Sequence, residues 1–206
     1  MAAYELSSLN GSNGFSISGG SAYDQAGLAV SSAGDINGDG LGDIIIGAGR
    51  ATVNDEAFVG KSYVVFGSTE SFGAELELSN LDTSTGLLIK GIDSYDLAGR
   101  AISSAGDING DGLDDVLIGA YRADPNAKSK AGETYVVFGV KDSDQTSLDL
   151  SSLNGNNGFV VNGETETDYS GFSVSTAGDV NGDGIDDIII GARYSDPNGQ
   201  YDAGSS

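Results

Sequence analysis

The feature that most constrains how this chain folds is a repeat of 72 residues. The string AGD(I/V)NGDG occurs three times, with its first aspartate at Asp35, Asp107 and Asp179. The string YVVFG occurs at residues 63–67 and again at 135–139, with the same spacing. Copies that follow one another without insertion or deletion indicate that one supersecondary unit is stacked on its neighbours.

Each unit is predicted to consist of short β-strands. Its apolar runs are rich in Val and Ile and are bounded by Gly, Asn and Asp, which is typical of strands joined by tight turns. In the first unit we expect strands at 14–19, 26–34, 43–48 and 61–67, and one helical turn near residues 6–9. No longer window shows a helical period, so the predicted fold class is all-β.

A β-propeller is the architecture that this pattern favours. Four-stranded sheets repeated along a chain are typical of propeller blades, because radial repetition protects sheet edges that an open sheet would expose. The small residues Ala29, Ser31 and Ala33 suit the crowded axis at which blades converge. We therefore expect blades of four antiparallel strands, built from about three 72-residue repeats.

The repeat register also predicts how the blades divide the chain, which we treat as one segment, 1–206. Residues 1–19 supply the outer strand of a preceding or closing blade, 20–91 the first blade, 92–163 the second, and 164–206 an incomplete third. Such a set of blades is too small to close a ring. We expect an incomplete ring with two open sheet edges, which further propeller repeats of the same or another chain would cover.

The motif with the most specific chemistry is the acidic loop between the second and third predicted strands. Oxygen-bearing side chains stand at positions 1, 3, 5 and 9 of the loop, and glycine stands at position 6. Ca²⁺ prefers about six to eight oxygen ligands, and a tightly turning loop points alternate side chains inward while a main-chain carbonyl at position 7 adds to the set. The predicted calcium ligands are Asp35, Asn37, Asp39, Leu41 and Asp43; Asp107, Asn109, Asp111, Leu113 and Asp115; and Asp179, Asn181, Asp183, Ile185 and Asp187.

Two other interpretations compete with a calcium site. The sequence NGDG also suits a hairpin turn with solvated acids. Three copies with every ligand position filled favour metal, because carboxylates held close together repel one another without a cation. An EF-hand is rejected, since it requires Glu at position 12, where this chain has Ile46, Ile118 and Ile190. We therefore expect three Ca²⁺ sites, each in a loop between two strands.

Composition excludes several classes of function. The chain contains 31 Asp and Glu against 9 Lys and Arg, a formal charge of −22, so nucleic acid is not an expected partner. Cys and His are absent, which excludes disulfides, thiolate nucleophiles, imidazole-based triads, and zinc or iron sites that use either residue. The sequence shows neither the pattern of a signal peptide nor an apolar run long enough for membrane insertion.

The motifs resemble the FG-GAP repeats of integrin α-subunit N-terminal propellers and their bacterial relatives. Phe-Gly at 66–67 and 138–139 matches the FG part, and Gly-Ala at 47–48, 119–120 and 191–192 matches the GA, although the proline is missing each time. The resemblance covers nearly the whole chain. It implies a calcium-binding propeller, extracellular or at the cell surface, that serves recognition or adhesion.

The expected function is that of a non-catalytic module that binds an extracellular protein or glycan. Loops on a rigid scaffold usually carry recognition, and the long loops 52–60, 123–132 and 195–204 are candidates on the face opposite the acidic loops. The alternative is an accessory or catalytic propeller of a secreted carbohydrate- or lipid-active enzyme. Catalysis is disfavoured, because one ring needs one site and no acid pair clearly breaks the repeat.

Overall fold

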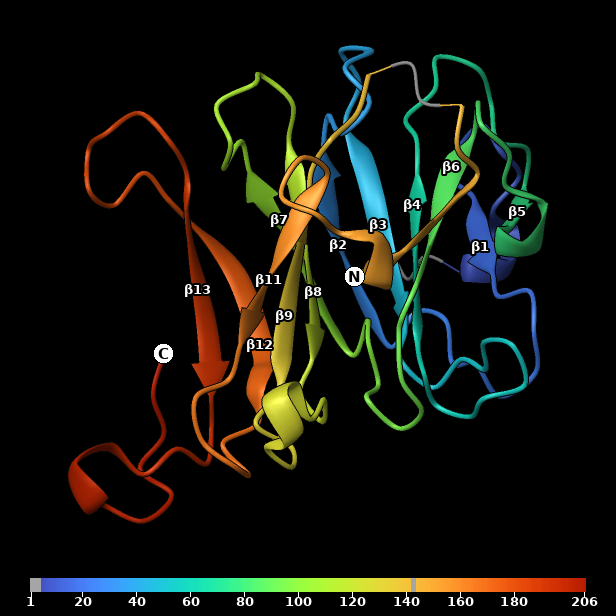
Figure 1. The fold of residues 1–206 in the computed structure, drawn as a ribbon. Coiled ribbons are helices and arrows are strands. Elements are labelled where there is room, and N and C mark those ends of the chain that lie inside the picture. The colour runs from blue at the N-terminus through green and yellow to red at the C-terminus, as the bar shows by residue number, and fades with distance from the viewer. Residues whose placement is uncertain (1–4, 142–143) are drawn as a thin grey trace.

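The computed structural model describes residues 5–141 and 144–206, which form short strands joined by turns. The antiparallel strands of the first blade are, in order, β2 (Ala29–Gly34), β3 (Asp43–Ala48), β4 (Lys61–Val65) and β6 (Gly86–Lys90). Those of the second blade are β7 (Ala101–Gly106), β8 (Asp115–Ala120), β9 (Glu133–Val137) and β11 (Gly158–Asn162). The two sheets stand side by side in Figure 1. The predicted all-β fold with four-stranded antiparallel blades is confirmed.

The third repeat forms a smaller sheet. Its strands β12 (Ser170–Gly178) and β13 (Asp187–Ala192) pair antiparallel, and a single bridge joins Ala192 to Ser205. The helices are short 3₁₀ turns at Leu6–Ser8, Leu78–Asn80, Leu150–Ser152, Pro125–Ala127 and Pro197–Gly199. Three of these turns recur 72 residues apart, as the helical turn predicted near residues 6–9 requires. Within the described ranges, no helix has the length and apolar character needed to cross a membrane.

The structure adds one strand to each of the first two repeats that the sequence did not predict. Strand β5 (Glu75–Glu77) pairs in parallel with β1 (Ser16–Ser18), and β10 (Ser147–Asp149) pairs in parallel with β6. Both β5 and β10 lie in the connection between the third and fourth strands of their own blade. The outer strand of one blade is therefore extended by a connection that belongs to the next repeat.

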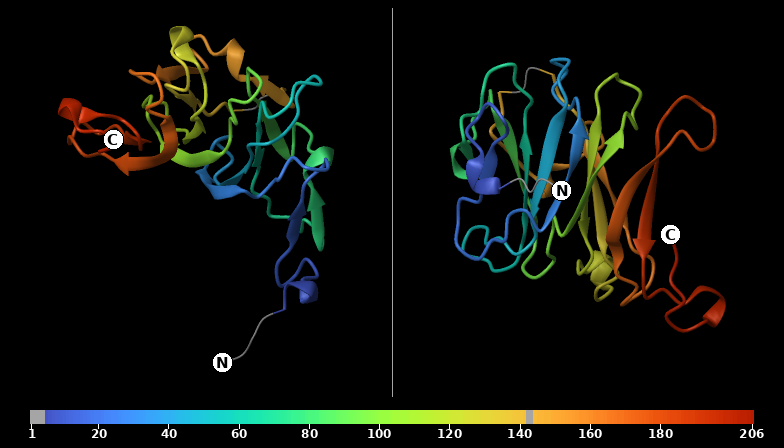
Figure 2. Two further views of the ribbon diagram at one scale, coloured as in Figure 1. Left: turned by 90° about the horizontal axis from the view of Figure 1, so that it is seen from below. Right: turned by 180° about the vertical axis from the view of Figure 1, so that it is seen from behind.

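The blades are arranged around their first strands. Strands β2, β7 and β12 are neighbours in space, and from below the sheets fan out in an open arc (Figure 2). The close approach of the blades explains the glycine of the Gly-Ala motif. A Cβ atom on Gly47 would lie 2.0 Å from the carbonyl oxygen of Gly99, and one on Gly119 would lie 2.2 Å from that of Gly171. Over the described residues the arc does not close, which agrees with the predicted incomplete ring.

Candidate functional site

The three acidic hairpins connect β2 to β3, β7 to β8 and β12 to β13, so they lie at the same end of neighbouring blades. In the first hairpin, one carboxylate oxygen of Asp35 accepts hydrogen bonds from the backbone N–H groups of Gly38 and Asp39, at 2.8 and 3.1 Å. The other carboxylate oxygen of Asp35 accepts a hydrogen bond from the backbone N–H of Gly40 at 2.9 Å. The same three bonds occur in the second and third hairpins. Gly40 has a φ of +87°, which permits this tight curl.

The last aspartate of each of the first two hairpins is buried and binds the FG motif. One oxygen of Asp43 accepts from the backbone N–H of Ile36 at 2.9 Å, and the other accepts from that of Gly67 at 2.7 Å. Asp115 makes the equivalent bond to Gly139 at 2.9 Å. The glycine of the FG motif therefore ties the third strand of the blade to the acidic hairpin.

Electrostatics at these buried carboxylates favours a nearby positive charge. Burial raises the pKa of Asp115 to about 6, against the lowering effect of the hydrogen bonds from Gly139 and Ile108, and the charges of Asp111 and Asp107 raise it further. The pKa of Asp43, the counterpart in the first hairpin, is also raised, by burial first and then by the charges of Asp39 and Asp35. A cation placed among these groups would favour their ionised forms and oppose the effect of burial.

The structure places the predicted ligands of each hairpin on one turn without gathering them into a metal shell. Asn37 accepts a hydrogen bond from the N–H of Asp39 at 2.9 Å, and Asp39 accepts one from the N–H of Leu41 at 2.7 Å. Among residues 5–141 and 144–206, no three acidic side chains lie close enough together to hold a metal ion. The donor set consists of oxygen atoms alone, which suits a hard cation such as Ca²⁺, and the ligand assignment stays a prediction.

Neighbouring hairpins are joined by the acid at position 8, which the sequence analysis did not include among the ligands. The Asp114 carboxylate accepts from the backbone N–H of Asp35 at 2.7 Å, and the N–H of Asp114 donates to the Asp35 carbonyl at 3.1 Å. Asp186 accepts from the N–H of Asp107 at 3.1 Å in the same way. A Cβ atom on Gly34 would lie 2.2 Å from an Asp114 oxygen, so glycine is required there.

Removing this contact should loosen the junction of the first two blades. We expect Asp114→Ala to lower the free energy of unfolding by about 1–2 kcal/mol, because it leaves the N–H of Asp35 without its charged acceptor. The first hairpin has Gly42 at position 8, where an added Cβ would meet no atom within 4 Å. Gly42→Asp is therefore the matched control and should be neutral. Urea unfolding measures both changes, and equal stability of Asp114→Ala and the unchanged chain would contradict the expectation.

On the opposite face, the long loops that the sequence analysis proposed for recognition also hold the blades together. The N–H groups of Tyr95, Leu97 and Ala98 donate to the carbonyls of residues 57, 58 and 59, at 3.2, 3.1 and 3.0 Å. Equivalent bonds join residues 129–131 to residues 167–170. Much of the backbone of these loops is therefore engaged between blades, and their side chains are what they offer for other contacts.

Close to these loops, the first two blades differ in a buried charge pair. Asp24, which is 6% exposed, forms an ion pair with Lys61 at 3.3 Å. The counterpart of Asp24 is Asp96, which is 8% exposed, but the counterpart of the lysine is Glu133. The hydroxyl of Tyr135 donates to the Glu133 carboxylate. No hydrogen bond or ion pair from the described part of the chain reaches the Asp96 carboxylate.

Asp96 is buried, and three other acids lie near it. Burial raises the pKa of Asp96 to about 7, and the charges of Asp93, Glu133 and Asp124 contribute to the rise. Burial also raises the pKa of Glu133. We call these four acids the acidic junction; sequence reasoning missed it, although the exchange of lysine for glutamate between repeats was the visible signal.

A second departure from the repeat lies between the second and third blades. The ring centroid of Tyr121 is 5.7 Å from that of Tyr169 and 5.2 Å from that of Phe172, and Tyr169 is 5.3 Å from Tyr194. The guanidinium carbon of Arg193 lies 3.8 Å from the ring centroid of Phe172 and 4.4 Å from that of Tyr194. We call these five residues the aromatic cluster. It gives the face opposite the hairpins a group of four rings, whose counterparts in the first repeat are Gly49, Gln25, Leu28 and Arg50.

Comparison with known families agrees with the hairpins and with the Gly-Ala motif, which lie inside the matched residues. The model of the FG-GAP repeat matches residues 26–65, 98–137 and 170–206, which together make up more than half of the chain. The chain belongs to the FG-GAP repeat family. Each FG-GAP match begins at or just before the first strand of a blade and contains one acidic hairpin. The resemblance inferred from the sequence motifs is confirmed.

Several curated proteins are similar in sequence to this chain. Phosphatidylinositol-glycan-specific phospholipase D of Bos taurus is 28% identical over 178 residues, covering 86% of this chain and 20% of that protein. Integrin alpha pat-2 of Caenorhabditis elegans is 31% identical over 172 residues, covering 77% of this chain and 12% of that protein. Integrin alpha-4 of Xenopus laevis is 30% identical over 172 residues, covering 82% of this chain and 14% of that protein. The chain thus spans a fifth or less of the length of these relatives.

Proposed function

We propose that this chain is a calcium-stabilised FG-GAP propeller module that recognises an extracellular protein or glycan and has no catalytic activity of its own. The observation that carries the proposal is the same all-oxygen hairpin, three times, at one end of adjacent blades. The similarity to integrin alpha proteins supports a role in recognition or adhesion, outside the cell or at its surface. We retain the blade boundaries predicted from the repeat register as part of the proposal.

The chain's own residues would hold the ion in a defined way. The first aspartate of each hairpin already curls the loop through three backbone N–H groups, and the last one is fixed by the FG glycine in the first two blades. Side-chain oxygens at positions 1, 3, 5 and 9 and the carbonyl at position 7 are the proposed ligands. Bound Ca²⁺ supplies the positive charge that offsets three carboxylates in each loop.

The aromatic cluster is the surface that we propose for ligand contact. Tyr194 is 38% exposed, and Arg193 beside it is also exposed. Aromatic rings and arginine are enriched in binding surfaces, because they combine a large apolar area with a polar group. This cluster lies on the face opposite the hairpins, so a ligand there would not compete with the proposed calcium sites.

A second candidate function is that of an accessory propeller of a secreted enzyme. The observation that favours it is the match to phosphatidylinositol-glycan-specific phospholipase D, which covers more of this chain than the integrin matches described above. In this case the present repeats would bind or position a carbohydrate or lipid substrate for another domain. Binding of the isolated chain to a glycan array or to glycolipid vesicles, compared with binding to cell-surface proteins, separates the two candidates.

Substitution of one hairpin tests the calcium assignment. We expect Asp107→Ala, at position 1 of the central hairpin, to remove one Ca²⁺ and to leave the other two sites filled, because repeat proteins store their interactions locally. Native mass spectrometry should count one ion fewer than in the unchanged chain. Glu70→Ala, which removes an exposed acid outside the hairpins, is the control and should not change the count. An unchanged count for Asp107→Ala would show that the ligand assignment is wrong.

A further inference from the structure

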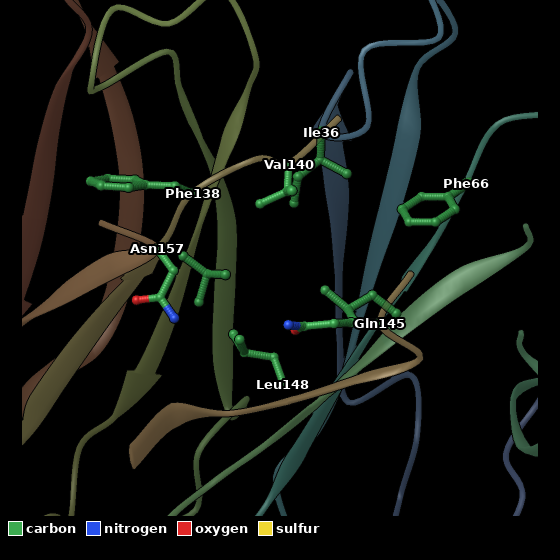
Figure 3. A pocket seen from close by; sticks show the side chains of 9 residues that line it. Ile36, Phe66, Phe138, Val140, Gln145, Leu148 and Asn157 are labelled. Atoms are coloured by element: carbon green, nitrogen blue, oxygen red, sulfur yellow. The ribbon is translucent and has the colours of Figure 1, made fainter. Parts of the chain in front are cut away.

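The junction between the first and second blades contains an apolar cavity of about 110 Å³ (Figure 3). It lies beside the residues that follow β4 and β9, where the FG motif ends each third strand. Its apolar lining comes from both blades and includes Ile36, Phe66, Leu87, Phe138, Val140 and Leu148. In Figure 3 the side chains of these two blades face one another across the space.

Comparison among the repeats shows which group is missing from this cavity. Leu87 corresponds to Phe15 in the preceding copy and to Phe159 in the following one. The ring of Phe15 packs on that of Phe72 with centroids 4.7 Å apart, and the ring of Phe159 lies 5.9 Å from that of Phe138. The counterpart of Phe72 in the second repeat is an exposed aspartate, Asp144. The copy that contains Leu87 and Asp144 therefore lacks both rings of the Phe15–Phe72 pair in the preceding copy and the ring of Phe159 in the following one.

We propose that this cavity is a binding site for a single aromatic ring, supplied by a small monocyclic aromatic molecule. An apolar cavity of roughly 150 Å³ lined by Leu, Ile and Phe stays dry and binds benzene, so a site of this size and lining suits the same chemistry. The amide of Asn157, at the edge of the cavity, is already engaged. It donates to the carbonyl of Ser152 at 3.3 Å and accepts from the N–H of Asn154 at 3.0 Å. The cavity touches the first acidic hairpin through Ile36, whose side chain is not one of the proposed calcium ligands.

Access to the cavity is available from solvent. Val140 is 50% exposed, and Gln145 is also exposed, so the cavity opens to solvent beside these two side chains. Ile36 and Val137, in contrast, are buried at 4% and 2% exposure and form the floor. A ring can therefore enter without the two blades separating.

Titration with benzene, followed in methyl NMR spectra of the full chain in Ca²⁺, tests the proposal. We expect saturable ring-current shifts at the methyl groups of Leu87, Leu148 and Val137. Leu87→Phe fills the cavity with the ring that both neighbouring copies carry, so it should weaken benzene binding at least tenfold. Phe15→Leu makes the reverse exchange one repeat earlier, where the ring packs on Phe72 outside the cavity lining, and should leave the affinity unchanged.

A second variant that fills the cavity keeps the test decisive if Leu87→Phe does not fold. Leu148→Phe enlarges another side chain that lines the cavity and should also weaken benzene binding. Absence of saturable shifts in the unchanged chain would overturn the proposal. Equal affinity in the unchanged chain and in a folded Leu87→Phe or Leu148→Phe variant would overturn it as well, because benzene would then bind elsewhere.

Discussion

Removing Ca²⁺ with a chelator is expected to lower the free energy of unfolding of this chain by about 4 kcal/mol. If each hairpin binds in the range of extracellular modules, about 10⁻⁴–10⁻³ M, Ca²⁺ at tenfold its dissociation constant contributes about 1.4 kcal/mol per site. Three independent sites give the total, which is a large part of the ~5–15 kcal/mol of a typical domain. Urea unfolding in chelator and in about 10 mM Ca²⁺, which is tenfold the upper end of this range of dissociation constants, measures the difference.

The calcium effect should also depend on pH. Burial holds the pKa of Asp115 at about 6, so this carboxyl takes up a proton as the pH falls through that value and then competes with Ca²⁺. We expect the calcium-dependent stabilisation to be smaller at pH 5 than at pH 7.5, because the site that contains Asp115 loses affinity for Ca²⁺ as this carboxyl is protonated. Mg²⁺ at equal ionic strength is the control for screening of the net charge. Identical unfolding curves in chelator and in Ca²⁺ at pH 7.5 would contradict the calcium sites.

Glu133→Lys is expected to stabilise the chain by about 2 kcal/mol at pH 8, because it supplies the acidic junction with the cation that Lys61 supplies in the first blade. Asp96 has a pKa of about 7 in the folded chain, above its ordinary value near 4. The stability associated with a raised acid pKa is present at low pH and is lost as the pH rises through 7. The gain from Glu133→Lys should therefore be largest at pH 8 and small at pH 5.

Two matched variants separate this local effect from a general reduction of negative charge. Glu70→Lys changes the net charge equally at an exposed site and should give only a small gain. Lys61→Glu places two acids in the first blade and should destabilise the chain at pH 8 more than at pH 5. A gain from Glu133→Lys that is the same at both pH values, or no larger than that from Glu70→Lys, would contradict the role of Asp96.

The strands were predictable from the sequence because their signals are local. The run at 43–48 is bounded by an aspartate and a glycine, and it coincides with β3 as the structure has it. Strand β5 was missed, since its sequence is Glu-Leu-Glu and three alternating residues do not identify a strand. It forms because the outer strand β1 offers an edge to it, and this edge belongs to another repeat. Pairing between distant segments is therefore what the local pattern lacked.

The site was predictable only in part for a related reason. The predicted calcium ligands of each hairpin share one short loop, so their spacing in the sequence was enough to predict them as a group. The acidic junction and the aromatic cluster combine residues from separate segments, and each member taken alone reads as an ordinary surface residue. Their signal was a departure from the repeat, such as Tyr121 where the first copy has Gly49 or Glu133 where it has Lys61. Comparing the copies position by position, rather than searching for shared motifs, would have identified both groups.

The parallel pairing of β10 with β6 bears on how arrays of this kind grow by gene duplication. A repeat copied in tandem carries one outer strand and one connection that extends the outer strand of the unit before it. Inserting a copy between two existing units therefore creates one new edge and one new covering strand together. Each unit contributes one outer strand and one covering strand. The array can therefore gain or lose whole units of 72 residues without leaving an internal outer strand uncovered. Insertions of a fraction of a unit do not have this property, which favours an uninterrupted spacing between copies.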